Sequence, residues 1–143
     1  MARKKYSMVM NKNIPITTQG QGLYEFTDKV NSLVSQLDVK SGICNLFLQH
    51  TSAGLIIQEN ADPSAKKDLE TWLARLVKEN DPLYTHIFEG ADDMPSHIKS
   101  VLTGNTLTIP IIDGQLALGT WQGIYLWEFR SRAQKRNVIV SIL

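Results

Sequence analysis

The feature that most constrains the fold is a strand-like segment that ends in a tight-turn dipeptide. In Asn105–Ile112, leucine and isoleucine occupy positions 107, 109 and 111, and the side chains between them are threonine or proline. This alternation is typical of a β-strand with one buried face. Asp113-Gly114 follows at once and predicts a two-residue hairpin into a second strand at Gln115–Leu118. The chain therefore contains β-sheet.

Further strand-length apolar segments are spread along the chain. They are Tyr6–Asn11, Gly42–Gln49, Gly54–Ile57, Ile124–Phe129 and Val138–Leu143. We expect the last two to form a second hairpin. The segment between them, Arg130–Arg136, carries four basic residues, which is typical of a solvated surface turn.

Three segments have the spacing of helices. Apolar residues recur every three or four positions from Leu23 to Leu37, which predicts one buried helical face. Asp62-Pro63 predicts a helix start, because Asp accepts hydrogen bonds at an N-cap and Pro suits the first helical position. The helix that follows is expected to bury Leu69, Trp72, Leu73, Leu76 and Val77. A third, short helix is expected from Pro95 to Leu102, closed by Gly104.

Strands throughout the chain with about three helices between them indicate an α+β fold. The length of 143 residues is that of one domain, so we expect residues 1–143 to form a single unit. Hydrophobic residues make up 43% of the chain and charged residues 20%, which excludes a disordered or fibrous protein.

Charge and cysteine content narrow the function classes. A formal net charge of +1 provides no global field to recruit nucleic acid, so we expect no nucleic-acid partner. The single cysteine, Cys44, excludes an internal disulfide and is compatible with a reducing cytosol. Because Cys44 lies in an apolar segment, we expect its thiol to be buried and to have no functional role. Neither a signal-peptide core nor a membrane-length apolar stretch is present, so we expect a cytoplasmic protein without membrane partners.

The three histidines, His50, His86 and His97, lie in polar segments at predicted element boundaries. Imidazole is a common metal ligand, and three such donors leave a fourth position open, as catalytic zinc requires. Their spacing matches no established zinc signature, so solvated or capping histidines are the alternative interpretation.

The long loop Glu79–Pro95 carries His86 together with Glu89, Asp92 and Asp93. Loops longer than about 12–15 residues in a small domain are often functional. One of these carboxylates would orient a histidine or act as general acid or base. Alternatively, Asp92 or Asp93 caps the helix that begins near Pro95.

Gly119-Thr120-Trp121-Gln122-Gly123 interrupts a strand-like stretch, and its two glycines indicate a bulge or a close approach to a ligand. Trp121 would stack on a flat ring or pack in the core. Thr51 and Ser52 would donate hydrogen bonds to an anion or close a turn on their own backbone.

Four strings of residues together resemble a known family, in order and over nearly the whole chain. They are Leu48-Gln-His-Thr-Ser-Ala53, Glu59-Asn-Ala-Asp-Pro63, the segment from His86 to Lys99 that includes Glu-Gly-Ala-Asp-Asp-Met-Pro, and Gly119-Thr-Trp-Gln-Gly-Ile-Tyr125. They resemble the YjbQ family, whose members are described as secondary thiamine-phosphate synthases.

The resemblance implies an α+β subunit with mixed β-sheets in a sandwich-like core, assembled as a homotrimer. It also implies a polar site near subunit contacts, with His50, His86 and His97 as metal ligands. Motif positions are also occupied by Thr51, Ser52, Glu59, Asp62, Glu89, Asp93, Thr120 and Gln122. Two positions depart from the pattern: Gln58 replaces a frequent Asn, and Ala61 replaces a frequent Cys, so no thiol role transfers to position 61.

The implied reaction joins an aminopyrimidine-methyl diphosphate to a thiazole phosphate and releases diphosphate. Glu89, Asp93, Ser52 and Gln122 are then expected to be catalytic, and Thr51, Lys99, Thr120 and Trp121 to bind the substrate or its phosphate. Three histidines favour zinc as the divalent metal, whereas a diphosphate favours magnesium with carboxylate ligands. Either the thiamine activity is a side activity, or the histidines carry protons and donate to phosphate.

A different class of function also accounts for the same residues. The alternative is a non-catalytic trimer that binds a metal and a small phosphorylated metabolite without turnover.

Overall fold

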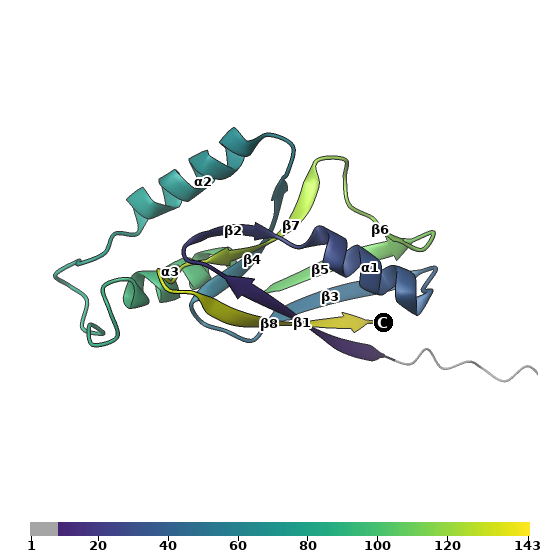
Figure 1. Cartoon of the computed structure of the whole chain (residues 1–143), viewed down its shortest axis with the longest axis horizontal. Helices are drawn as coiled ribbons and strands as arrows, with labels where there is room; N and C mark the ends of the chain where they lie inside the picture. Colours follow the sequence, from purple (N-terminus) through teal and green to yellow (C-terminus); the bar gives the residue numbers. More distant parts are fainter. Residues whose placement is uncertain (1–8) are drawn as a thin grey trace, which may run out of the picture.

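The fold consists of two antiparallel sheets and three helices, as seen in a computed structural model that describes residues 9–143 (Figure 1). The strands are β1 (Met10–Thr18), β2 (Gly22–Glu25), β3 (Gly42–Leu48), β4 (Ala53–Glu59), β5 (Thr106–Ile112), β6 (Gln115–Leu116), β7 (Gln122–Glu128) and β8 (Gln134–Ile142). The helices are α1 (Thr27–Leu37), α2 (Pro63–Leu76) and α3 (Asp93–Thr103).

The two sheets face each other across the main core. The larger sheet has the order β1-β8-β3-β5-β6 and the smaller has the order β2-β7-β4. Leu46 and Val140 of the larger sheet pack in one cluster with Leu55 and Leu126 of the smaller one, and α1 adds Val30. The expected sandwich-like α+β fold is therefore confirmed. Every strand pair within residues 9–143 is antiparallel, where mixed sheets were expected.

The outer face of the small sheet packs against α2. Tyr125 and Trp127 of β7 share a second buried cluster with Leu73 and Val77, and Figure 1 shows α2 as an outer layer beside β2 and β4. The predicted start of α2 is confirmed, since the Asp62 carboxylate accepts the Ser64 N–H at 2.9 Å.

Two residues of α2 that were predicted to be buried are exposed. Trp72 is 59% exposed and Leu76 is 56% exposed. A sheet of three strands covers only a narrow stripe of the helix, and Leu73 and Val77 fill that stripe.

The predicted hairpin between Ile124–Phe129 and Val138–Leu143 is wrong. β7 pairs with β2 and β4, whereas β8 pairs with β1 and β3 in the other sheet. Both strands turn apolar side chains into one core, so their patterns alone do not distinguish pairing from facing.

The N-terminal elements also differ from prediction. The helix predicted from Leu23 begins at Thr27, and Leu23 belongs to β2. The first strand runs from Met10 to Thr18, and residues 6–8 of the predicted strand Tyr6–Asn11 lie outside the described residues. Over residues 9–143, no helix combines the length and apolar character needed to cross a membrane.

Candidate metal centre

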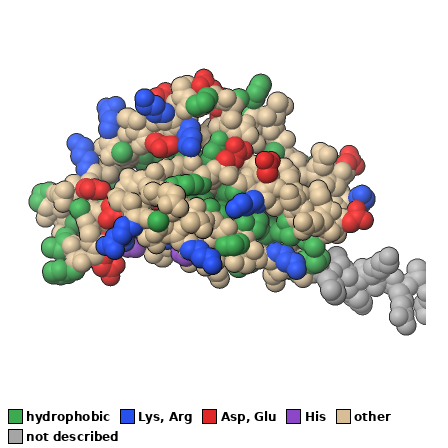
Figure 2. Space-filling model, viewed as in Figure 1, with side chains coloured by type: hydrophobic (Ala, Val, Ile, Leu, Met, Phe, Trp, Pro, Cys, Tyr) green, Lys and Arg blue, Asp and Glu red, His purple; other side chains and the backbone are tan. Residues whose placement is uncertain are grey.

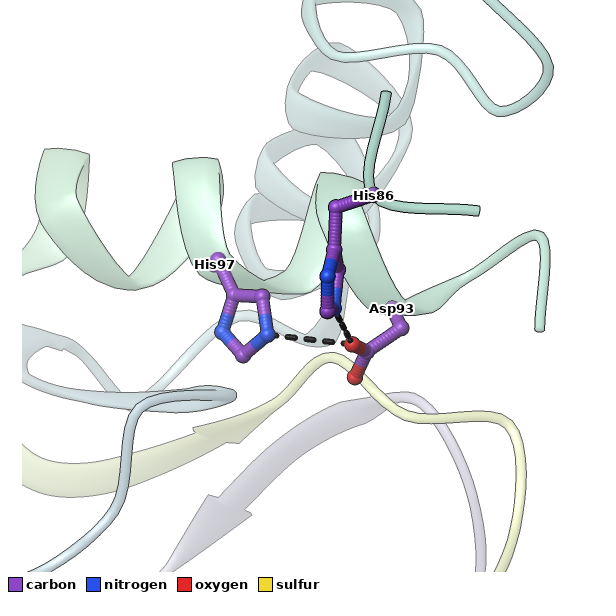
Figure 3. Close-up of side chains that lie close together, drawn as sticks. All are labelled: His86, Asp93 and His97. Atoms are coloured by element: carbon purple, nitrogen blue, oxygen red, sulfur yellow. Dashed lines mark hydrogen bonds and ion pairs between the residues drawn. The ribbon is translucent and has the colours of Figure 1, made fainter. Parts of the chain in front are cut away.

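Two histidines converge on one carboxylate at the start of α3. His86 comes from the segment 77–92 that links α2 to α3, while Asp93 and His97 lie one helical turn apart on α3. Oδ2 of Asp93 lies 2.6 Å from Nε2 of His86 and 3.1 Å from Nε2 of His97 (Figure 3). We call these three residues the histidine–aspartate group.

The group lies at the surface, although its carboxylate is buried. The Asp93 side chain is 3% exposed, whereas that of His86 is 46% exposed. Figure 2 shows histidine side chains reaching the surface near α3, with acidic and basic side chains beside them. A small molecule or an ion in solution therefore has access to the imidazoles.

Arg130 neutralises the other oxygen of Asp93. Its Nη1 pairs with Oδ1 of Asp93, its Nε donates to Asp92 at 3.0 Å, and its Nη2 donates to the Glu89 carbonyl at 3.0 Å. Burial opposes the charge of Asp93, but the hydrogen bond from His86 and the charges of His97 and Arg130 outweigh it and lower its pKa. Asp93 is therefore a carboxylate with one oxygen directed at the imidazoles.

The backbone carbonyl of Thr51, just before β4, fixes the orientation of the His97 ring. Nδ1 of His97 lies 2.8 Å from the Thr51 carbonyl oxygen. A carbonyl only accepts hydrogen bonds, so Nδ1 carries a hydrogen and Nε2 is left for a second proton or a metal ion. Metal-bound histidines commonly have this arrangement, in which the distal nitrogen donates to a fixed acceptor.

The donor set fits a transition metal. One atom from each of His86, Asp93 and His97 lies within 4.8 Å of the other two. Two imidazoles and a carboxylate suit zinc or a related ion and leave coordination positions open, whereas magnesium prefers oxygen ligands. Glu89 is nearby, with its Oε2 3.9 Å from Nε2 of His86.

The structure leaves His50 outside this group. Nε2 of His50 accepts the backbone N–H of Asn137 at 2.9 Å, and Arg136 approaches Nδ1 at 3.4 Å. Burial and the charge of Arg136 lower the pKa of His50, despite the opposing charge of Glu128. His50 is thus held neutral.

His50 and His97 nevertheless line one surface cavity of about 310 Å³. Thr51, Ser100, Val101, Gly104 and Asn105 complete its wall. A second cavity, of about 190 Å³, lies against His86 and is lined further by Tyr84, Ile87 and Met94. The histidine–aspartate group therefore has one histidine in each of two cavities.

The other predicted site residues are distributed over the molecule. Ser52 lies near His50, where its hydroxyl accepts from Arg136 at 2.8 Å. Lys99 is buried against the Phe129 ring in a different cavity, and burial lowers its pKa against the opposing charges of Glu79 and Asp92.

The Thr120-Trp121-Gln122 motif lies at the far end of β7. In the β4–β7 ladder, Ala53 pairs with Glu128 beside the histidines, whereas Glu59 pairs with Gln122. Seven residues of strand separate these ends by about 20 Å. Trp121 is 63% exposed rather than packed in the core. The motifs that were expected to share a site therefore form two clusters within one chain.

Three charged residues of the site were not predicted from the sequence. Arg130 binds carboxylates 37 and 38 positions away, and Arg136 forms a buried ion pair with Glu128, with 2.8 Å between Nε and Oε1. Both arginines were assigned to a solvated turn. The sequence showed these two arginines only as members of a basic cluster, and their spacing gave no indication of their carboxylate partners.

Comparisons with known proteins give a consistent result. Residues 12–143 match the model of a family described as UPF0047 protein YjbQ-like. A UPF0047 protein of Synechocystis is 51% identical over 127 residues, covering 89% of this chain and 86% of the relative. The UPF0047 protein YjbQ of Escherichia coli O157:H7 is 40% identical over 136 residues, covering 94% and 98%.

Solved structures show the same similarity. A conserved hypothetical protein of Thermus thermophilus has a TM-score of 0.83 at 36% identity, covering 92% of this chain and 99% of that one. An uncharacterised YjbQ/UPF0047 protein of Clostridium acetobutylicum has a TM-score of 0.85 at 34% identity, with the same coverage.

Proposed function

The chain belongs to the UPF0047 family of YjbQ-like proteins, and on this premise we propose that it is a metal-dependent enzyme acting on a small phosphorylated metabolite. The activity implied by the family resemblance is thiamine-phosphate synthesis, which joins an aminopyrimidine-methyl diphosphate to a thiazole phosphate. The observation that carries the proposal is the convergence of His86, Asp93 and His97 beside two open cavities.

The histidine–aspartate group would hold the metal through Nε2 of both histidines and Oδ2 of Asp93. A bound divalent ion, with zinc favoured and magnesium possible, would act as a Lewis acid toward a phosphoryl oxygen. The protein contributes the orientation of the ligands. The Thr51 carbonyl fixes the His97 ring, and Arg130 holds Asp93 by its other oxygen.

Glu89 is the best-placed residue to accept a proton. Its side chain is 67% exposed and its carboxylate reaches to 3.9 Å from His86. An exposed carboxylate beside the open side of the group would hold a proton released from the substrate or from water.

We also propose that the chain acts as a homotrimer, as the resemblance implies. Side chains of the large sheet that alternate away from the core are almost uncharged, with Lys135 the only charge among them in β1, β8, β3 and β5. Ile43 and Phe47 on this surface are 45% and 43% exposed. A flat surface so poor in charge is suited to contact another copy of the chain.

One observation favours the second candidate, a metal- and metabolite-binding trimer without turnover. Neither cavity beside the histidines has a Lys or Arg among its lining residues. A departing diphosphate needs cationic stabilisation, which these walls do not provide.

A paired measurement of metal content and product formation tests both candidates. Wild-type protein, Asp93→Asn and the control Asp68→Asn, at an exposed position of α2, are purified, assayed for bound metal, and incubated with the two thiamine precursors. The proposed enzyme forms thiamine phosphate in the wild type and the control and loses both metal and product in Asp93→Asn. Metal without any product supports the second candidate, and full turnover in metal-free protein overturns the metal-dependent mechanism.

A further inference from the structure

Lys99 is a buried cation on the other side of α3 from the histidines. Lys99 lies two positions after His97, which places the two side chains about 200° apart around the helix. Lys99 is 7% exposed, yet within residues 9–143 its ammonium group has neither a hydrogen-bond acceptor nor an ion-pair partner. A charge removed from water requires compensation from its surroundings.

Its surroundings form a small separate cavity. Nζ lies 5.8 Å from the centroid of the Phe129 ring, and the cavity of about 60 Å³ is lined by Gln21, Gly22, Glu70, Leu73, Ala74, Lys99, Trp127, Glu128 and Phe129. Because the ammonium group is not fully enclosed and binds no described residue, its N–H groups open into this cavity.

Lys99 has no direct ion-pair partner among the described residues: the charges of Glu79 and Asp92 act on it without reaching ion-pair distance, and the carboxylate of Glu128 is engaged elsewhere. This carboxylate accepts hydrogen bonds from Arg136, Thr18 and the backbone N–H groups of Phe129 and Arg130. Its charge is already neutralised by the Arg136 guanidinium, to which it is paired. The aromatic face of Phe129 stabilises Lys99 only partly.

We propose that this cavity is a binding site for a small monocarboxylate, which pairs with Lys99. The site is separate from the histidine–aspartate group and goes beyond the proposed metal-dependent function. Trp127 and Phe129 form its apolar wall, and Lys99 provides the charge-assisted hydrogen bonds.

Size and charge select a carboxylate over a phosphate. A cavity of about 60 Å³ has room for about four water-sized atoms, which is the number of non-hydrogen atoms in acetate. Phosphate has five, and at neutral pH it carries more charge than acetate. Glu70 also lines the cavity and repels a doubly charged anion more than a singly charged one. We therefore expect Lys99 to bind a carboxylate here, and the phosphate-binding role predicted for it from the sequence stays a prediction that titration with phosphate tests.

Titration of the wild type and two variants with sodium acetate tests the proposal. The readout is the NMR signal of the Trp127 indole N–H, assigned with Trp127→Phe, at constant ionic strength. The wild type should show a saturable shift that neither chloride nor inorganic phosphate reproduces. Lys99→Met, which preserves the length of the side chain, should bind acetate at least tenfold more weakly. Glu70→Gln should bind it more tightly, by up to about fivefold.

Three results would each overturn the proposal: an absent or non-saturable shift in the wild type, equal binding in folded Lys99→Met, or phosphate binding as tight as that of acetate. If Lys99→Met does not fold, an unchanged acetate affinity in Glu70→Gln is contrary to the proposal. Metal content is measured on the same samples. Because metal binding by Lys99→Met is expected to be unchanged, failure of this site and failure of the metal centre are distinguished.

Discussion

At the residue scale, the two oxygens of Asp93 have different partners, and this division creates the candidate centre. Oδ1 pairs with Arg130, while Oδ2 faces His86 and His97. Burial favours the protonated acid, but the hydrogen bond from His86 and the charges of His97 and Arg130 together lower the pKa of Asp93 and keep it ionised. Because Arg130 pairs with Oδ1, it contributes to this ionised state and leaves the other oxygen for a metal ion.

Substitution of single histidines tests which of them are ligands. We expect His86→Ala and His97→Ala to lower zinc affinity by at least about 100-fold, because each removes one of three donors. His50→Ala should retain wild-type zinc affinity, because His50 lies outside the group. Competition titration with a chromogenic chelator measures the three affinities. An equal loss in His50→Ala would restore the three-histidine centre predicted from the sequence.

The protonation of His50 gives a second prediction at this scale. Burial and Arg136 lower its pKa below the ordinary 6.5, so His50 remains neutral in the folded protein when an unfolded histidine takes up a proton. The free energy of unfolding therefore decreases as the pH falls below about 6.5. The decrease is complete once the pH has fallen below the pKa of His50 in the folded protein.

Histidine NMR titration of the metal-free protein measures that pKa directly. Urea unfolding at pH 7.5 and pH 5.5 should show a larger loss of stability in the wild type than in His50→Gln. A His50 pKa at or above 6.5 would contradict the environment described for this ring.

At the scale of elements, the Glu128–Arg136 ion pair joins the two sheets beside the site. Glu128 ends β7 in the small sheet, and Arg136 lies in β8 of the large one. Arg136 also donates to the carbonyl and hydroxyl of Ser52. The pair thereby holds the segment whose Thr51 carbonyl orients His97.

Removal of one partner should be costly, because it leaves a buried charge unpaired. We expect Arg136→Met to reduce the free energy of unfolding by about 3–5 kcal/mol. The double variant Glu128→Gln/Arg136→Met, which removes both charges, should recover about 0.5–3 kcal/mol of this loss. Urea denaturation measures both. If the double variant is no more stable than Arg136→Met, the ion pair does not couple the sheets.

The elements predicted correctly from the sequence are those defined by neighbouring residues. Asp62-Pro63 marks the start of α2, and Asp113-Gly114 the turn between β5 and β6, because caps and turns depend on residues a few positions apart. The partners of β7 and β8 could not be predicted in this way. The choice between pairing and facing depends on contacts between distant segments, such as Glu128 with Thr18.

The same distinction applies to the candidate site. The sequence identified His86, His97 and Asp93 as chemically competent, because they lie in polar segments within or next to the long predicted loop. It could not separate His50 from them, since the N–H of Asn137 that occupies its ring nitrogen is 87 residues away.

At the scale of the whole molecule, the motif residues occupy two opposite ends of the small sheet. The histidine–aspartate group lies beside the Ala53–Glu128 end, and Gln122 lies at the Glu59 end. One chain cannot bring them together across about 20 Å of strand. A cyclic trimer could combine them if its head-to-tail contacts placed each histidine end against the Gln122 end of a neighbouring copy. The predicted roles of Gln122 and His97 in one reaction therefore require a site shared between subunits.

Mixing two inactive variants tests this shared site. His97→Ala and Gln122→Ala are each expected to be inactive alone. In trimers assembled at random from equal amounts, one interface in four combines an intact histidine end with an intact Gln122 end, so about a quarter of wild-type activity should return. The control mixture of His86→Ala and His97→Ala, both altered at one end, should remain inactive. If the first mixture stays as inactive as the control, the site lies within single chains, and the Gln122 motif acts elsewhere.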